Sequence, residues 1–416
     1  MYLISFLFAI TLVLFSIFYT KEKYNAFILA NIVNIATTFL MPLIGTFFTV
    51  DLEISAVATV FNIIALLVFF IMYLRGRKKE AQQKQEEEDN SNGSYLKVLL
   101  FISLAINTLF VLYNVLSYGF ASSFINSRAE IYMQNRQGSG QIYYVAATFL
   151  NIYVIIGMFI FKRPLFHLFI CILFVLPYGS KSRILIILFQ FLIYFLFIHK
   201  NRYKYKKPIY LLLLIIITPI IGFVLFWFTT YGLDSLEIVQ MGLSFGNEYQ
   251  SFFNELVINF NSYFPRGHLG GKILLEDSLY PFIPRAIWGS KPEYFGSLYL
   301  AYQVFPEKTL MNTGAPSFGP FGQAFADFGL FGIVQIIIEQ AFIGYFLGRF
   351  ELRVIKNRSV KNFMLLIAIG FGGILGIGGA INPVVMGLAN IGFISILFAP
   401  VKRKVRSSNR KELQNI

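Results

Sequence analysis

The sequence ISAVATVFNIIALLVFFIMYL at 54–74 is followed at once by RGRKKE at 75–80. The first stretch carries no charged side chain and has the length, about 20 residues, that a helix needs to cross the hydrocarbon core of a bilayer. The second stretch is a basic run of the kind that stays on the cytoplasmic side of a membrane. The pair predicts a membrane-spanning helix whose carboxyl end faces the cytoplasm.

Apolar stretches of this kind recur along the whole chain. We identify about eleven that reach or approach spanning length. Their approximate bounds are 2–20, 25–50, 54–74, 96–119, 143–161, 164–179, 184–199, 208–230, 323–349, 362–380 and 382–400. Hydrophobic residues make up 56% of the chain and charged residues 13%, which is too apolar for a water-soluble core. The sequence predicts an all-α, polytopic membrane protein, with 2–20 as a retained first helix because it lacks the features of a cleaved signal peptide.

The basic runs predict how the spans are oriented. They lie between apolar stretches, at 21–23, 75–80, 162–163, 199–207, 353–361 and 401–411. If the spans simply alternate, all six runs fall on one side, which must be the cytoplasm. The N-terminus is then outside, the C-terminus is inside, and 121–142, 179–183 and 231–322 are outside. The net charge of +14 is explained by these loops and does not indicate nucleic acid.

Three units follow from this topology. Residues 1–230 hold the first eight spans, with a polar cytoplasmic loop at 75–95 that we expect to be disordered. Residues 231–322 form a large outer loop, and residues 323–416 hold the last three spans and a basic tail. A loop as long as 231–322, rich in aromatic residues and proline, is usually functional.

Few kinds of chemistry remain for a chain of this composition. The sequence has neither a Walker motif nor an HExxH motif. The single cysteine, Cys171, lies in an apolar run, and the three histidines are too scattered for a metal cluster. We therefore expect neither a metal nor another cofactor, and attention turns to cations on the predicted outer side.

One such group is YGSKSR at 178–183, where Lys181 and Arg183 begin a helix on the side that usually lacks positive charge. The N-terminus of a helix favours anions, and two cations there would strengthen its preference for phosphate. Extension of both side chains to lipid headgroups is an equally good explanation.

A second group is FPRGHLGG at 264–271 followed by PFIPRAIWGSKP at 281–292. Arg266, Arg285 and Lys291 could form an anion cradle here, because the planar guanidinium binds phosphate with two hydrogen bonds and keeps its charge in a dry site. The alternative is a set of salt bridges with the many acids of the same loop.

Two further segments face the same side. The loop at 124–140 contributes Arg128 and Arg136 as hydrogen-bond partners for a sugar. The glycine- and proline-rich NTGAPSFGPFGQAFADFGLFG at 312–332 leads into the ninth span and is expected to line a cavity or to allow close helix packing. The run GFGGILGIGGA at 370–380 is most simply small-residue packing within a helix.

The segments PFIPRAIWGSKP and TGAPSFGPFGQAFADFGLFG, with GSKSR and SRAEIY, resemble those of bacterial O-antigen and capsule polymerases, the Wzy-type repeat-unit polymerases. The resemblance implies a GT-C-like membrane glycosyltransferase of the inner membrane. Such an enzyme moves a growing glycan from undecaprenyl diphosphate onto another lipid-linked repeat unit, at the outer face and without a metal. Its implied partners are the undecaprenyl-diphosphate-linked oligosaccharide, membrane lipid, a chain-length regulator and a flippase.

The resemblance also implies roles for individual residues. Many relatives have Glu where this chain has Gln323, which removes one candidate acid or base. The outer-side groups that we nominate as a proton acceptor are Glu248 and His268. The predicted catalytic residues are Arg285, Arg183, Glu248 and His268, and the predicted substrate-binding residues are Arg128, Lys181, Arg266, Lys291, Arg136 and Gln323.

Two other functions compete with a polymerase. An O-antigen ligase-like enzyme would share the layout and the lipid diphosphate donor, and His268 keeps that option open. A flippase for the same lipid-linked sugar belongs to a class that is often built from paired repeats with broken helices in matching positions. The concentration of Gly, Pro and cations in one outer region favours the polymerase.

Overall fold

The computed structural model of the chain describes residues 2–22, 24–35, 56–83, 93–120, 140–179, 181–199, 252–283, 287–310, 318–376 and 382–399. Every regular element in these ranges is a helix, so the all-α prediction is confirmed for them. The helices are α1 (Tyr2–Thr20), α2 (Ala26–Ile35), α4 (Ala56–Ala81), α5 (Gly93–Tyr118), α8 (Gly140–Ile160), α9 (Pro164–Val175), η2 (Leu176–Tyr178), α10 (Lys181–Phe197), α14 (Phe260–Tyr263), α15 (Lys272–Leu279), η3 (Tyr280–Phe282), α16 (Gly296–Val304), α17 (Pro306–Leu310), α18 (Gly319–Phe328), η4 (Gly329–Phe331), α19 (Gly332–Lys356), α20 (Val360–Gly370) and α21 (Pro383–Leu397).

Four stretches are long and apolar enough to cross a membrane: Ala56–Ala81, Gly93–Tyr118, Gln141–Ile160 and Gly319–Lys356. Shorter apolar helices occupy five more of the predicted spans. The predicted span at 208–230 and most of the one at 25–50 lie outside the described residues. The described part is therefore that of a multi-pass membrane protein, whereas the count of eleven spans and a GT-C-like arrangement stay predictions.

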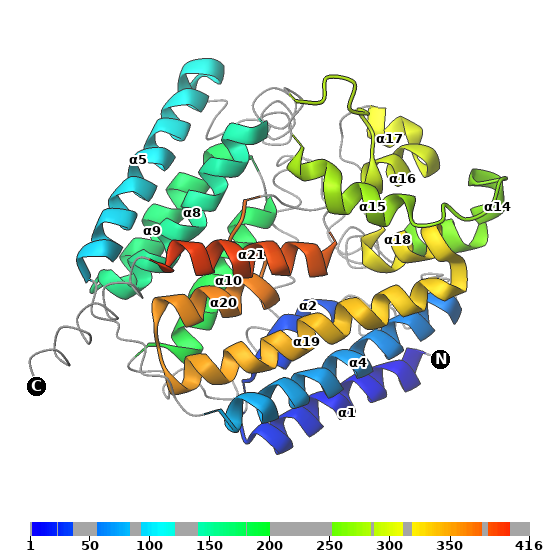
Figure 1. Cartoon of the computed structure of the whole chain (residues 1–416), viewed down its shortest axis with the longest axis horizontal. Helices are drawn as coiled ribbons and strands as arrows, with labels where there is room; N and C mark the ends of the chain where they lie inside the picture. The colour runs from blue at the N-terminus through cyan, green and yellow to red at the C-terminus, as the bar shows by residue number, and fades with distance from the viewer. Residues whose placement is uncertain are drawn as a thin grey trace, which may run out of the picture.

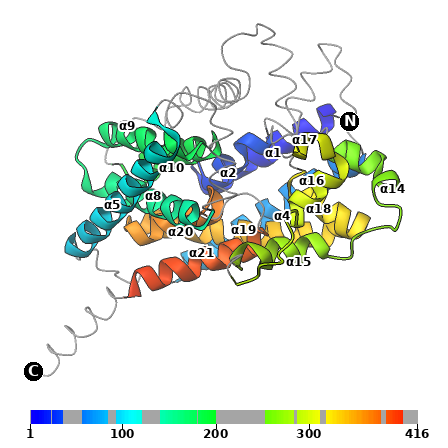
Figure 2. The same ribbon diagram turned by 90° about the horizontal axis from the view of Figure 1, so that it is seen from above.

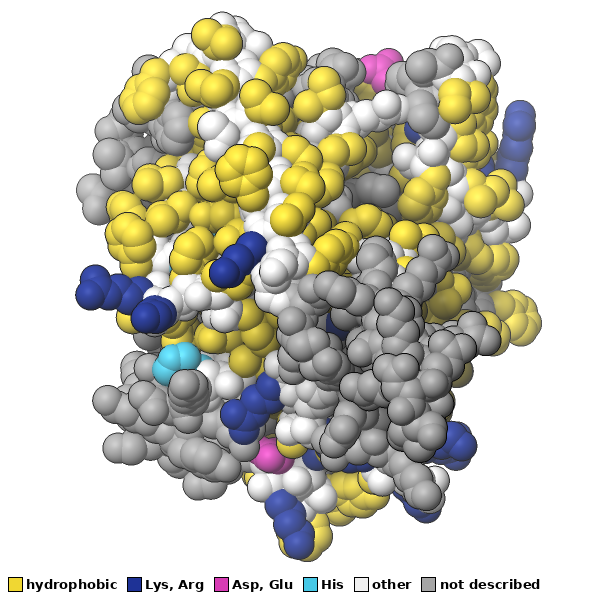
Figure 3. All heavy atoms as spheres, turned by 60° about the vertical axis from the view of Figure 1, so that its left-hand side comes forward, with side chains coloured by type: hydrophobic (Ala, Val, Ile, Leu, Met, Phe, Trp, Pro, Cys, Tyr) yellow, Lys and Arg dark blue, Asp and Glu magenta, His cyan; other side chains and the backbone are white. Residues whose placement is uncertain are grey.

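Helix α5 shows how the bundle is adapted to lipid. Its polar residues Ser103, Asn107 and Asn114 are fully buried, while Phe101 and Leu116 on the other side are 71% and 84% exposed. A helix at the surface of a soluble protein has the opposite distribution. Figure 3 shows the face on this side of the molecule, whose upper part carries mainly hydrophobic side chains. An exposed apolar surface of this extent is expected where lipid is the solvent.

Helices α4 and α19 pack closely and run parallel (Figure 1). A Cβ atom at Gly344 or Gly348 of α19 would collide with the backbone oxygen of Phe69 or Tyr73, respectively. In the same way, a Cβ atom at Gly76 of α4 would collide with a carbonyl of α19. Small residues are needed here because helices in a membrane associate through close backbone packing.

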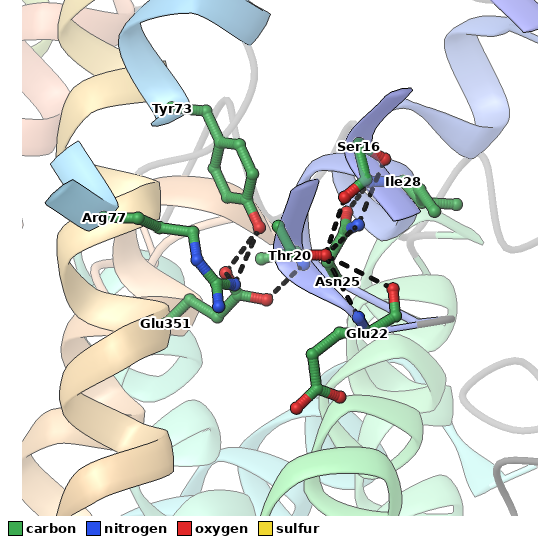
Figure 4. A network of polar contacts seen from close by, with 9 residues as sticks. Ser16, Thr20, Glu22, Asn25, Ile28, Tyr73, Arg77 and Glu351 are labelled. Atoms are coloured by element: carbon green, nitrogen blue, oxygen red, sulfur yellow. Dashed lines mark hydrogen bonds and ion pairs between the residues drawn. The ribbon is translucent and has the colours of Figure 1, made fainter. Parts of the chain in front are cut away.

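A buried network joins the carboxyl ends of these two helices to the link after α1 (Figure 4). Glu351 of α19 pairs with Arg77 of α4 and also accepts hydrogen bonds from the Tyr73 hydroxyl at 2.5 Å and the Ala26 backbone N–H at 2.8 Å. A buried carboxylate is tolerated when its charge is paired and its oxygens are hydrogen-bonded. The network therefore holds three segments distant in sequence at one end of the bundle.

Other described helix ends that lie next to basic runs are found at this same end of the bundle, where α4 and α19 finish. We call it the basic end. The centre of the Phe159 ring, near the end of α8, lies 5.6 Å from the ring centre of Tyr194 in α10 and 5.7 Å from that of Phe363 in α20. The hydroxyl of Tyr95 in α5 donates to the backbone oxygen of Leu397 in α21 at 2.6 Å. This grouping is the one that alternating spans require, and its assignment to the cytoplasm stays a prediction.

The loop predicted at 75–95 is helical at both of its margins, so its predicted bounds are wrong there. Helix α4 continues to Ala81, and α5 begins at Gly93. The extension of α4 is stabilised because Glu80 accepts hydrogen bonds from Arg349 at 3.0 Å and Arg353 at 2.8 Å, both on α19. Charged residues thus continue the helix by pairing with a neighbour.

The opposite end of α4 and α19 carries helices α14–α18, and we call it the loop end (Figures 1 and 2). A separate hydrophobic cluster lies there. Within this cluster the centre of the Phe253 ring lies 6.2 Å from the ring centre of Phe61 in α4 and 6.1 Å from that of Phe325 in α18. The described part of the predicted outer loop is therefore a folded helical unit that packs on the bundle.

Candidate functional site

The most unusual feature of the bundle is a break between α20 and α21. The continuous helix predicted at 362–380 is wrong, because α20 ends at Gly370. Gly372 and Gly373 follow with φ angles of 94° and 78°. This left-handed region suits glycine, which has no Cβ atom to clash. The glycine-rich run therefore unwinds the chain inside the bundle. The expectation of close packing holds for Gly376, where a Cβ atom would collide with the backbone of α8.

Side chains from distant helices satisfy the backbone of this break. Asn390 of α21 accepts hydrogen bonds from the N–H groups of 374–375 at 2.8 and 2.9 Å, and Thr148 of α8 accepts from Gly376 at 2.7 Å. Asn151 donates to the carbonyl of 374 at 2.9 Å. Non-helical backbone within a membrane is tolerated only where protein or water surrounds it. Polar residues inside apolar helices were the sequence signal for these contacts, which the motif search missed.

Arg183 lies against the same break. It is only 8% exposed, its Nε donates to the Tyr143 hydroxyl at 3.2 Å, and its Nη2 donates to the backbone oxygen of Gly376. The guanidinium carbon lies 5.3 Å from the centre of the Tyr143 ring. Extension of Arg183 to lipid headgroups is thus excluded. Both partners are neutral, and no ion pair joins Arg183 to a carboxylate of the described residues, so its charge is not cancelled by them.

The motif YGSKSR positions Arg183 through a tight turn. Gly179 has a φ of 65° and ends η2, which lets α10 begin at Lys181. The preceding Tyr178 is fully buried, and its hydroxyl donates to Asn107 of α5 at 2.8 Å. Arg183 is therefore held in the first turn of α10 by a turn that is itself anchored in the bundle. The side chain of Lys181 lies outside the described residues.

At the loop end, the structure brings together two motifs that are far apart in sequence. The backbone N–H groups of Leu269 and Gly270 donate to the carbonyls of Ala326 and Asp327 at 3.0 and 2.9 Å. The segment FPRGHLGG at 264–271 thus pairs with the end of α18, which belongs to the glycine- and proline-rich segment at 312–332. Sequence reasoning placed both motifs on one side of the membrane but did not predict this pairing.

His268 lies within this contact as an exposed aromatic ring. It stacks on Phe260 at 4.4 Å between ring centres and meets Phe325 edge-on at 5.7 Å. A Cβ atom at Gly329 would clash with its imidazole. The surroundings of His268 in the described part of the chain are therefore mainly apolar.

Acids of the outer loop bind backbone N–H groups in this region. Asp327 accepts from the N–H groups of 273–274 at 3.0 and 2.8 Å and so caps α15. Asp277 accepts from Ser297 at 3.1 Å and Glu276 from Gly296 at 2.7 Å, which fixes the start of α16. Burial raises the pKa of Asp277 to about 7, and the nearby charges of Asp327 and Glu276 act in the same direction. These acids serve as helix caps, and none of the three forms a salt bridge with a lysine or arginine of the described residues.

Lys291 binds the chain at the end of η3. Its Nζ donates to the backbone oxygens of Tyr280 at 2.6 Å and Ile283 at 3.0 Å, and it lies 4.7 Å from the centre of the Phe295 ring. Its ammonium group is thus held by backbone oxygens of η3 and of the residue that follows it.

Of the remaining predicted site residues, the structure describes two. Arg266 is exposed in the turn between α14 and α15, and Gln323 is half-buried on α18. Arg285, Glu248, Arg128 and Arg136 lie outside the described residues. The structure thus brings Arg266 and His268 into one segment beside α18, whereas Arg183 lies at the helix break.

These features define a multi-pass helical membrane protein with a buried cation at an unwound helix. Over 255 residues, 59% of its length, the chain is 33% identical to the O-antigen polymerase of Salmonella typhimurium, and the same values hold for that of Salmonella typhi. The predicted resemblance to O-antigen polymerases is confirmed by this similarity. The chain spans 59% of the length of these relatives. No family model matches the sequence, and no solved structure matches it.

Proposed function

We propose that this chain polymerises undecaprenyl-diphosphate-linked oligosaccharide repeat units into O-antigen or capsular polysaccharide. The proposal rests on the 33% identity to two O-antigen polymerases. The reaction is glycosyl transfer without a metal, and the loop end of the bundle faces the outer side of the cytoplasmic membrane. A chain-length regulator and a flippase act with the enzyme.

The chemistry asks little of the protein beyond charge and position. A sugar diphosphate is an activated donor, so the enzyme must stabilise the departing diphosphate and hold the acceptor hydroxyl in line. Arginine suits the first task because it stays charged in a dry site. Arg183 supports this assignment, since its guanidinium is buried between neutral partners. Arg285 and Arg266 act with it from the outer loop, and Lys181 from the start of α10.

The other predicted residues are assigned to the glycan. Arg128 and Arg136 bind sugar hydroxyl groups from the second outer loop, and Gln323 does so from α18. Lys291 binds substrate together with Arg285, and its ammonium group also binds the backbone oxygens of Tyr280 and Ile283. The sequence nominates Glu248 and His268 as acceptors of the hydroxyl proton.

A reconstituted reaction tests the proposal. Purified protein in detergent, given undecaprenyl-diphosphate-linked repeat units alone, should produce a ladder of longer glycans, and a chelator should leave the ladder unchanged. A ligase would need a second acceptor, and a flippase would give no covalent product. Arg285→Ala should abolish the ladder at normal protein abundance, and Arg285→Lys should restore it only in part. Absence of a ladder with the wild-type protein would overturn the proposal.

A further inference from the structure

Helix α19 carries two buried glutamates whose surroundings differ in kind. Glu351, at the basic end, is fully buried and has a cation, a hydroxyl and a backbone N–H as partners. Glu339, in the second turn of α19 near the loop end, is 1% exposed. No lysine or arginine of the described residues forms an ion pair with Glu339. Glu351 thus has the partners of a structural ion pair, and Glu339 has no such cation among the described residues.

The partners of Glu339 are two amides that contact only one of its oxygens. Gln335 Nε2 donates to Glu339 Oε1 at 2.8 Å, and Asn382 Nδ2 donates to the same oxygen at 2.7 Å. Glu339 Oε2 and Gln335 Oε1 are both buried without a hydrogen-bond partner among the described residues. Two acceptors left unmatched on neighbouring side chains are costly, and such groups in native proteins call for an explanation, of which a catalytic role is one.

Glu339 and Gln335 are linked to the helix break through Asn382. Asn382 caps α21, with its Oδ1 accepting from the N–H groups of 384–385 at 2.9 and 3.4 Å. Gly376, the last described residue before it, is bound by Arg183. Five residues separate these anchors, so an extended chain would join them over at most about 22 Å. Gln335 and Asn382 are half-buried, so Glu339 lies directly beneath partly accessible polar groups.

We propose that the unmatched oxygens of Glu339 and Gln335 bind a hydroxyl group of the acceptor sugar, and that Glu339, in place of Glu248 and His268, is the catalytic base of glycosyl transfer. This inference rests on the proposed function. The acceptor oxygen forms a bond to the anomeric carbon of the donor while the bond from that carbon to the diphosphate breaks. The diphosphate leaves with the electron pair, and the hydroxyl proton passes to the Glu339 carboxylate. Arg183, which binds Gly376, is the cation assigned to the departing diphosphate.

Substitution of the two glutamates in the full chain tests this role. In the ladder assay with lipid-linked repeat units, Glu339→Gln should lower turnover by at least about 100-fold, the usual contribution of a general base. The same variant should leave KM for the repeat unit little changed and remove the fall of the rate at low pH. Glu339→Asp should recover part of the activity. The matched control, Glu351→Gln, should reduce the amount of folded protein and leave turnover per folded molecule unchanged.

Two outcomes would overturn the role of Glu339. The first is wild-type turnover by Glu339→Gln in a preparation where the wild-type protein makes a ladder, whereas a wild-type protein that makes no ladder contradicts the proposed function itself. The second comes from the unaltered protein, should the variant fail to fold. A hydrophobic carbodiimide, which modifies carboxyl groups in apolar surroundings, should label Glu339 and not Glu351, and the repeat-unit lipid should protect Glu339. Labelling that the lipid does not slow would contradict the assignment.

Discussion

Arg183 donates a hydrogen bond to the backbone oxygen of Gly376 and thereby joins the start of α10 to the break between α20 and α21. The contact makes one side chain responsible for both a fixed positive charge and the shape of the unwound segment. Loss of Arg183 should therefore affect folding and chemistry together, which the next experiment separates.

Arg183→Ala should lower the stability of the detergent-solubilised protein by roughly 1.5–3 kcal/mol, because hydrogen bonds from a charged donor are lost in a buried setting. Arg183→Lys keeps the charge and one of the contacts. It should regain most of the thermal stability but only part of the polymerisation rate, since the planar fork is lost. The exposed Arg75 on α4 provides the control, and Arg75→Ala should alter neither quantity. Full activity of Arg183→Lys would argue that charge alone suffices.

Arg77→Met should destabilise the bundle by about 3–5 kcal/mol, because it leaves the buried carboxylate of Glu351 without its cation. Thermal unfolding of the purified protein and its abundance in membranes measure the loss. The double variant Arg77→Met with Glu351→Met should recover part of the stability, since the uncompensated charge is gone. Equal stability of Arg77→Met and the wild type would show that the pair contributes little.

Gly348→Ala should weaken the contact between α4 and α19, because the added Cβ would meet the backbone oxygen of Tyr73, which cannot move aside. We expect a drop in thermal stability of the size typical of overpacking, about 1–3 kcal/mol. Gly392→Ala in α21 is the matched control, since nothing lies within 4 Å of a Cβ atom there. A helical Ala in open space should leave stability unchanged or raise it. Similar losses in both variants would contradict the packing argument.

The loop end should lose stability as pH rises from about 4 to about 7, through Asp277. Its pKa in the folded protein is raised to about 7 by burial, with the charges of Asp327 and Glu276 adding to the effect. The unfolded chain releases this proton near pH 4, so between the two values the folded state binds more protons and its stability falls with pH. Asp277→Asn should remove this dependence and stabilise the protein above pH 7.

Hydrogen exchange of the Ser297 amide, which donates to Asp277, reports this local stability. Exchange should be more strongly protected at pH 5 than at pH 8 after correction for the intrinsic rate. In Asp277→Asn the protection should be alike at both values. Protection that rises with pH in the wild-type protein would show that the folded-state pKa is not raised.

Much of the fold could be predicted because bilayer length and loop charge act locally. The stretch at 54–74 and the run at 75–80 suffice to place α4 and its basic end, since each property is carried by neighbouring residues. The bounds of the loop after α4 could not be predicted. The helical extension to Ala81 depends on Arg349 and Arg353, which are more than 260 residues away.

The candidate site could be predicted only in part. Arg183 stood out because a cation on the predicted outer side is an exception to a general bias. Glu339 did not stand out, since a single acid inside an apolar helix has the same sequence appearance as Glu351. The two differ only through their partners, Asn382 for one and Arg77 for the other, and both partners come from other helices.

The amino-acid sequence by itself determined that the chain is a helical membrane protein and approximately where its apolar helices lie. These properties follow from the transfer of each segment between water and lipid, which depends on that segment alone. Only the tertiary structure decided that the chain unwinds after Gly370 and that Arg183 binds the backbone oxygen of Gly376. It alone also decided that Glu339 Oε2 has no hydrogen-bond partner among the described residues. Hydrogen bonds inside the bundle are made between helices, and their pairing depends on how all of the helices pack at once.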